Sequence, residues 1–272
     1  MQHIVFTTLL TLVIQFACGQ SVSTQIGARA AGMAYTSACL KDEWSLFNNM
    51  AGLASVEKAI ATSTYDAKPR LEGANRSALA LAIPTKIVVV GLGALRFGND
   101  LYNEQLLSLG LSNQLGLASL GLTLNYLQYS AQGFGTKSML TVSAGGIASL
   151  SEYVTIGAYV NNINQPMLSE LDGEKAPTTL SLGVGFTPTE KVQLSTELSK
   201  EIDHDTTFKT GIEYKATKKF FARTGFSLYP NNIFFGVGFA QHKLSIDYAY
   251  QYALTGLGES HQASVAYKWK KK

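Results

Sequence analysis

The fold is decided by the stretch VQLSTELS at residues 192–199, in which apolar and polar side chains alternate strictly. The same alternation returns in LSIDYAYQ at residues 244–251 and in LSLGVGFT at residues 180–187. Successive side chains of a β-strand point to opposite faces, so each stretch has one apolar and one polar face. These stretches therefore predict strands whose two faces meet different environments.

Outward from these stretches, alternating segments cover the chain from residue 58 to residue 269, each closed by Gly, Pro, Asn or charged residues. The expected strands are 58–67, 76–84, 86–97, 104–112, 116–129, 137–148, 153–163, 177–187, 191–201, 206–215, 219–229, 232–240, 243–253 and 261–269. An even strand count with short turns at one end is typical of outer-membrane barrels. We therefore expect an all-β protein, a transmembrane antiparallel β-barrel of about 14 strands, formed by residues 58–272.

The composition agrees with a protein that places few charges on its surface. Charged residues make up 15% of the 272 residues, where soluble globular proteins average about 25%. A net charge of +3 provides no basic cluster for nucleic acid and too little charge for a disordered chain. A helical membrane protein is excluded because the sequence has no apolar run of about 18 residues.

Residues 1–19 predict a secretory signal peptide. They contain no Lys, Arg, Asp or Glu, and residues 4–17 form a mostly apolar stretch that is too short for a spanning helix. The small residues Ala17 and Gly19 place the cleavage site before Gln20. A lipoprotein cut before Cys18 is the alternative. We expect export to the outer membrane of a Gram-negative cell, with both chain termini in the periplasm.

Residues 20–57 are rich in Gly, Ala and Ser and lack strict alternation, which predicts short helices or irregular structure. The strand expected at 86–97 is apolar on both faces, so an apolar group must pack against its inner face. We expect residues 20–57 to fold into the barrel as a plug. The expected anchors of this plug are Trp44, Leu46, Phe47, Met50 and Leu53.

Five charged residues fall on the polar face of the strands between about residues 191 and 253, namely Glu197, Lys209, Glu213, Arg223 and Asp247. A Lys or Arg that points into lipid near the midplane costs about 2–4 kcal/mol, so we expect these side chains to face the lumen. There they could form a ladder of ion pairs that fills the interior, or a polar wall that a solute touches.

The sequence predicts no catalytic, cofactor or metal site. Gly27 and Gly32 have the spacing of a phosphate loop, but the required Lys-Ser/Thr pair does not follow them. The histidines of the mature chain, none with a His or Cys at ligand spacing, are His204, His242 and His261. We therefore expect no enzyme, no cofactor and no nucleic-acid partner.

The stretches QIGARAAGM at residues 25–33 and KDEWSLFNNMAGLA at residues 41–54 resemble the start of PorV/PorQ-type outer-membrane proteins of Bacteroidota and their FadL-like relatives. In those families a GARAxGMG…NPAGLA stretch precedes the barrel, and Asn49-Met50 here replaces the Asn-Pro pair. The resemblance implies an outer-membrane barrel with an N-terminal luminal segment. The motif residues of that segment are Gly27, Arg29, Gly32, Asp42, Trp44, Asn48, Asn49, Gly52 and Leu53.

The same resemblance implies two kinds of function, because members of this group either act in type IX secretion or pass hydrophobic compounds across the outer membrane. We expect a non-enzymatic component of protein export or surface assembly. Its expected partners are outer-membrane lipid and other secretion or surface proteins. The alternatives are a passive channel for a hydrophobic small molecule and a structural barrel that scaffolds another membrane protein.

Overall fold

The computed structural model describes residues 23–168, 175–202, 204–254, 256 and 258–269. The expected signal peptide at residues 1–19 and the alternative cleavage before Cys18 lie outside the described residues.

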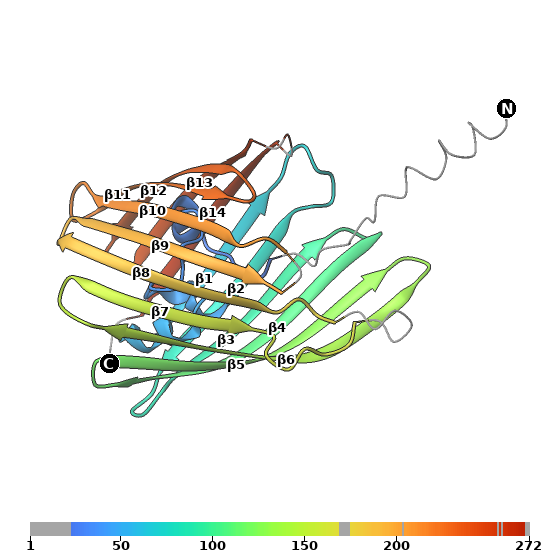
Figure 1. Ribbon diagram of the computed structural model, residues 1–272, viewed down its shortest axis with the longest axis horizontal. Coiled ribbons are helices and arrows are strands. Elements are labelled where there is room, and N and C mark those ends of the chain that lie inside the picture. The colour runs from blue at the N-terminus through green and yellow to red at the C-terminus, as the bar shows by residue number, and fades with distance from the viewer. Residues whose placement is uncertain (1–22, 169–174, 203, 255, 257, 270–272) are drawn as a thin grey trace.

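The chain forms one closed barrel in which each strand pairs antiparallel with its sequence neighbours, and the last strand pairs with the first (Figure 1). The strands are β1 (Ile60–Ala67), β2 (Arg76–Pro84), β3 (Val89–Gly98), β4 (Tyr102–Leu115), β5 (Ala118–Ala131), β6 (Gly135–Ser149), β7 (Val154–Asn161), β8 (Thr179–Thr189), β9 (Val192–Glu201), β10 (Thr207–Lys215), β11 (Phe220–Leu228), β12 (Asn232–Gln241), β13 (Leu244–Ala253) and β14 (Gly258–Lys268). The predicted fold class is therefore confirmed.

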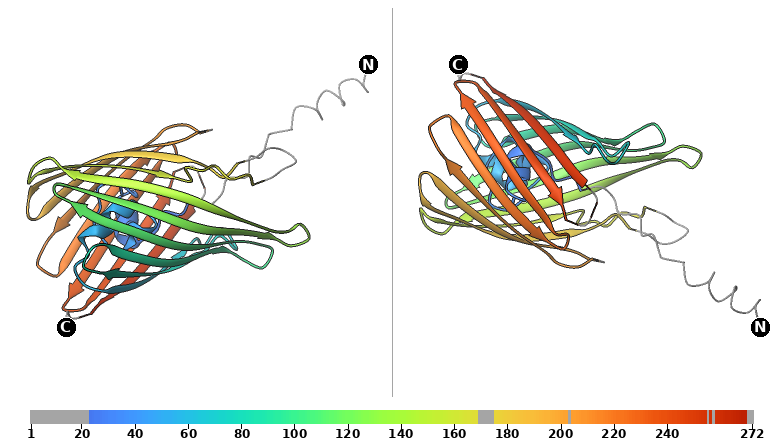
Figure 2. Two further views of the ribbon diagram at one scale, coloured as in Figure 1. Left: turned by 90° about the horizontal axis from the view of Figure 1, so that it is seen from below. Right: turned by 90° about the horizontal axis from the view of Figure 1, so that it is seen from above.

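Each of the fourteen expected segments corresponds to one strand, and the boundaries differ most where hairpins are long. Strand β4 has 14 residues, β5 has 14 and β6 has 15, and the β5–β6 hairpin reaches beyond its neighbours (Figure 2). The ladder there continues through polar residues beyond the expected bounds, such as Ser130 of β5 and Thr136 of β6, which pair with each other. Because these residues do not continue the apolar alternation, the sequence pattern ends before the strands do.

The barrel is apolar outside and polar inside, the reverse of a soluble protein. In β4 the side chains of Leu107, Leu109 and Leu111 are about half exposed, whereas Ser108 and Ser112 are buried. Among the described strands the charged residues on the outer face are Arg96, Lys200 and Glu259, each within three residues of a strand end. The outer surface around the middle of the barrel therefore suits lipid hydrocarbon.

We call the end of the barrel where β1 begins and β14 ends the terminal end, and the opposite end the far end. Three short helices precede β1: α2 (Ala28–Gly32), η2 (Glu43–Leu46) and η3 (Met50–Ser55). They lie inside the barrel (Figures 1 and 2), and we call residues 23–56 the luminal segment. No helix of the described residues is long and apolar enough to cross a membrane.

The luminal segment contacts all fourteen strands, so it is attached around the whole circumference of the barrel. Its close approach depends on inward-facing glycines. A Cβ atom would come within 3.0 Å of a luminal-segment atom at ten glycines of nine different strands, namely Gly91, Gly93, Gly110, Gly121, Gly145, Gly157, Gly183, Gly211, Gly225 and Gly236. We call these residues the glycine belt; they relieve the crowding that any larger side chain would cause.

Candidate functional site

Two motif glycines allow the luminal segment to fold on itself. Gly27 has φ +111°, and a Cβ there would lie 2.6 Å from Cγ of Trp44. At Gly52 a Cβ would overlap the carbonyl oxygen of Leu40. Because any other residue would push these neighbours away, both glycines are required by the packing. Gly32, in contrast, approaches the wall, where its added Cβ would lie 3.0 Å from Cα of Gly236.

The adjacent residues Asn48 and Asn49 make different hydrogen bonds. Asn48 closes the segment on itself, since its amide donates to the Ile26 carbonyl at 3.0 Å and accepts from the Ile26 N–H at 3.3 Å. Asn49 reaches the wall as well, because its amide nitrogen donates to the carbonyls of Ala38 at 2.7 Å and of Gly146 in β6 at 3.2 Å. Asn49 is fully buried, so these hydrogen bonds satisfy a group that would be costly to leave unpaired.

Apolar side chains of the luminal segment pack against β3 and β4. A Cβ at Gly91 would lie 2.8 Å from Leu53, and one at Gly110 would lie 2.6 Å from Met50. Trp44 is 2% exposed and Leu53 is fully buried. The structure thus places the five expected anchor residues in one core cluster with inner-face residues of β1 to β6.

A charge cluster that joins the segment to β10, β11 and β13 consists of Arg29, Asp42, Glu213, Arg223 and Asp247; we call it the Arg29 cluster. Arg29 lies 2.8 Å from Glu213 and 3.4 Å from Asp42. Glu213 also pairs with Arg223 at 2.5 Å, and Arg223 pairs with Asp247 at 2.6 Å. Two motif residues and three of the predicted luminal charges are therefore parts of one network.

A second cluster surrounds Glu197 of β9, which is 1% exposed. Its carboxylate accepts a hydrogen bond from the backbone N–H of Ala38 at 2.8 Å and pairs with Lys209 at 3.3 Å. The Lys209 ammonium in turn donates to Gln25 at 3.0 Å. Each of the five predicted luminal charges thus has an opposite charge within 3.3 Å, and both clusters hold the luminal segment.

The third cluster, formed by Arg76 of β2 with Asp66 of β1, was missed by sequence reasoning. Arg76 pairs with Asp66 at 2.5 Å and donates to the backbone carbonyls of Ser23 at 2.8 Å and Gln25 at 3.0 Å. Ser260 of β14 donates to the same Asp66 carboxylate. The available signal was a charged residue at an inward position of each strand, because both follow the alternation of their strands.

Two ionisable groups of the luminal segment stay protonated over the ordinary pH range. Burial raises the pKa of the Tyr35 phenol to about 12, so its hydroxyl accepts from Arg76 and donates to Gln262. Burial and the nearby Glu197 carboxylate raise the pKa of the Cys39 thiol to about 12. Cys39 is 6% exposed and behaves as a small packed side chain rather than a reactive thiol.

A cavity of about 740 Å³ lies between the luminal segment and the far end. Its floor includes Phe47, Asn48 and Met50 of the luminal segment. One wall is apolar, with Leu106 and Leu127, and the remaining lining is mostly hydroxyl and amide side chains from β5 to β9 and from the far-end loops. The volume is in the range of small-ligand sites, about 300–1,000 Å³. No group of three or more potential metal ligands occurs among the described residues.

A closed barrel with a lipid-compatible outer face, a polar interior and a folded segment in the lumen defines a class, the transmembrane β-barrels of the outer-membrane type. Within that class, the chain belongs to the family described as type IX secretion system membrane protein PorP/SprF, whose model matches residues 47–267. The expected resemblance to PorV/PorQ rested on residues 25–54, which lie mostly before this match, and stays a prediction.

Solved structures with the same fold include hydrocarbon channels. The Pseudomonas putida toluene transporter TodX has a TM-score of 0.70 at 12% identity, with 92% of this chain and 100% of that chain covered. The Ralstonia pickettii toluene transporter TbuX has a TM-score of 0.68 at 11% identity, with 92% and 99% covered. At these identities the likeness shows the fold alone. No curated protein matches the sequence.

Proposed function

We propose that the chain is a non-conducting component of type IX protein export in the outer membrane, where it docks a secreted or surface protein. The observation that supports this proposal is the luminal segment, which contacts every strand and is held by three ion-pair clusters. A barrel filled in this way offers its rims and its far-end cavity to partners instead of a path through the membrane.

In this proposal the terminal end faces the periplasm. The connections at the terminal end are short, for example residues 242–243 between β12 and β13 and residues 116–117 between β4 and β5. The longest connection, residues 162–178 between β7 and β8, lies at the far end. Short periplasmic turns and longer external loops are the rule in outer-membrane barrels.

Deletion of the gene, followed by an inventory of secreted and surface proteins, tests the proposal. We expect one or more proteins to disappear from the cell surface and medium, and to return when the wild-type gene is supplied in trans. A variant with Gly211 changed to Val, which removes the space for Met33, should restore less than the wild type. An unchanged inventory after deletion would contradict an export role.

A second candidate function is a passive channel for hydrophobic small molecules. It is supported by the apolar side of the cavity, where Phe47 and Met50 of the floor meet Leu106 and Leu127 of the wall. A toluene-uptake assay in cells that express the chain tests it. Uptake above that of cells without the chain would favour this function, and equal uptake would favour the docking function.

A further inference from the structure

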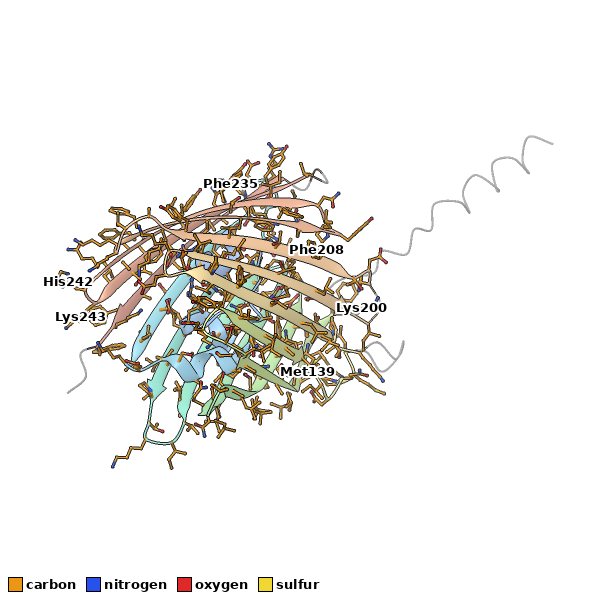
Figure 3. All side chains as sticks on the ribbon, turned by 60° about the vertical axis from the view of Figure 1, so that its left-hand side comes forward. Met139, Lys200, Phe208, Phe235, His242 and Lys243 are labelled. Atoms are coloured by element: carbon orange, nitrogen blue, oxygen red, sulfur yellow. The ribbon has the colours of Figure 1, made fainter. Side chains whose placement is uncertain are left out.

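The rim at the terminal end carries a sector of lysines on neighbouring turns. The connection between β8 and β9 contains Lys191, the connection between β10 and β11 contains Lys218 and Lys219, and the connection between β12 and β13 contains Lys243. Lys215 and Lys268, at the ends of β10 and β14, lie on the inner face of their strands. Lys191, Lys218, Lys219 and Lys243 lie on the part of the barrel from β8 to β13, and we call these four residues the lysine sector. Lys243 and its neighbour His242 lie at this end in Figure 3, and Lys200 lies at the other.

The lysine sector has little internal neutralisation. Glu190 is the one carboxylate in the connections that bear these lysines, and among the described residues no ion pair joins any of the four to a carboxylate. The one polar contact of their ammonium groups in this part of the structure is from Lys243 to the Tyr267 hydroxyl at 3.3 Å. The sector therefore presents several positive charges that need an external anion.

The turns between β2 and β7, on the other half of the same rim, indicate how deep in the membrane the terminal end lies. The turns between β2 and β3, between β4 and β5, and between β6 and β7 carry apolar tips at Ile87, Leu117 and Leu150, which are 77%, 75% and 63% exposed. Apolar tips with this exposure would be unfavourable in water, but they suit the boundary between hydrocarbon and headgroups. The lysines at the same end then lie at headgroup depth.

Aromatic side chains on the outer face support this placement. Tyr214, Phe220, Tyr267 and Trp269 lie beside the lysines and are 40–54% exposed. Aromatic belts of this kind mark the membrane–water interface in β-barrels. Ammonium groups just beyond such a belt reach the phosphates of the lipid headgroups, which attract them most strongly when the lipid has a net negative charge.

We propose that the lysine sector binds the headgroups of anionic phospholipids and so fixes which side of the barrel faces an anionic lipid annulus. This site is independent of the luminal segment and of the export role proposed above. An acidic protein surface is the competing occupant, and the test below separates the two.

The experiment compares binding of two lipids to the purified full chain by native mass spectrometry. Lipid-depleted protein in detergent is titrated with dioleoylphosphatidylglycerol, which is anionic, and with dioleoylphosphatidylcholine, which is zwitterionic. The test variant is Lys218→Gln with Lys219→Gln and Lys243→Gln. The matched control, Lys86→Gln with Lys175→Gln and Lys200→Gln, loses the same charge outside the sector. A third variant carries Arg at the three sector positions.

We expect the wild type, the control and the Arg variant to retain phosphatidylglycerol in preference to phosphatidylcholine, and the sector variant to lose that preference by about tenfold or more. Raising the ammonium acetate concentration should weaken the preference of the wild type, a measurement that needs no variant. Equal preference in the sector variant and the control would overturn the proposal and leave an acidic protein as the occupant. A wild type that does not distinguish the two lipids would overturn it as well.

Discussion

Arg29 of the luminal segment lies 2.8 Å from Glu213 of β10, and 184 residues separate the two in the sequence. Glu213 is shared with Arg223 of the wall. The carboxylate therefore lies between a guanidinium on the segment and one on the barrel, so the segment and wall are parts of one charged network. Charges with such partners in a low-dielectric interior hold their positions strongly.

Arg29→Ala should loosen the luminal segment. The ring of strands should stay intact, because Glu213 keeps Arg223 of the wall as a partner. We expect cells that express this variant to become sensitive to vancomycin, a large polar antibiotic that an intact outer membrane excludes. Arg96→Ala is the matched control, since Arg96 is exposed and its pair with Asp100 spans 3.9 Å. Equal sensitivity of the two variants would argue against the role of Arg29.

The ion pair of Arg76 and Asp66 should stabilise the folded protein, and removing one partner should cost more stability than removing both. Removing one partner of a buried pair costs about 3–5 kcal/mol because it leaves an uncompensated charge, and the two side chains are 6% and 1% exposed. Arg76→Leu should therefore destabilise the protein strongly. Arg76→Leu with Asp66→Leu should be less destabilised, as measured by urea unfolding in detergent. A double variant that loses the sum of both single losses would refute this coupling.

A glycine-belt substitution should expel part of the luminal segment. At Gly211 a Cβ would lie 2.5 Å from the carbonyl oxygen of Met33. The valine side chain of the Gly211→Val variant would therefore displace the backbone of Met33. We expect proteases to cleave within residues 23–56 in this variant but not in the wild type. The control is Gly146→Val on the outer face, where an added Cβ lies 3.3 Å from a leucine side chain. If residues 23–56 of the Gly211→Val variant resist proteases as completely as those of the control, the glycine belt is not needed to seat the luminal segment.

Cys39 should resist alkylation up to alkaline pH in the folded protein. The thiolate is the reactive form, and a pKa raised from 9.0 to about 12 leaves about one thiol in a thousand ionised at pH 9. Reaction with a maleimide should be slow at pH 7 to 9 and become rapid once the protein is unfolded. The measurement uses a Cys18→Ser background, with Lys218→Cys as an exposed control. If Cys39 and the thiol introduced by Lys218→Cys were labelled equally fast in the folded state, the luminal segment would have to be open.

The strands were predictable because a lipid-facing wall imposes a one-dimensional pattern. Residues 192–199 and 244–251 show it directly, and these strands begin and end within a residue of their expected bounds. The glycine belt was only partly foreseeable. Gly91 and Gly236 lie within strands and indicate relief of crowding, but the atoms that they admit belong to a distant part of the chain.

The ion-pair clusters of the lumen could be predicted only in part from the sequence. Glu213 and Arg223 are predictable as luminal from the alternation alone, but their meeting with Arg29 depends on the path of the luminal segment. Asp66 and Arg76 have the same signal but lie at strand ends, where the alternation gives way to turn residues. The turns of the lysine sector become neighbours as soon as consecutive strands pair, so this sector follows from the strand order once that order is known.

The central claim is that the luminal segment fills the barrel, and ion conductance across a planar lipid bilayer tests it most directly. The purified full chain, inserted into the bilayer, should add no steady conductance to that of lipid alone, whereas the Gly211→Val variant should open a measurable pore. A steady open-pore conductance of the wild type, equal to that of Gly211→Val, would contradict the account.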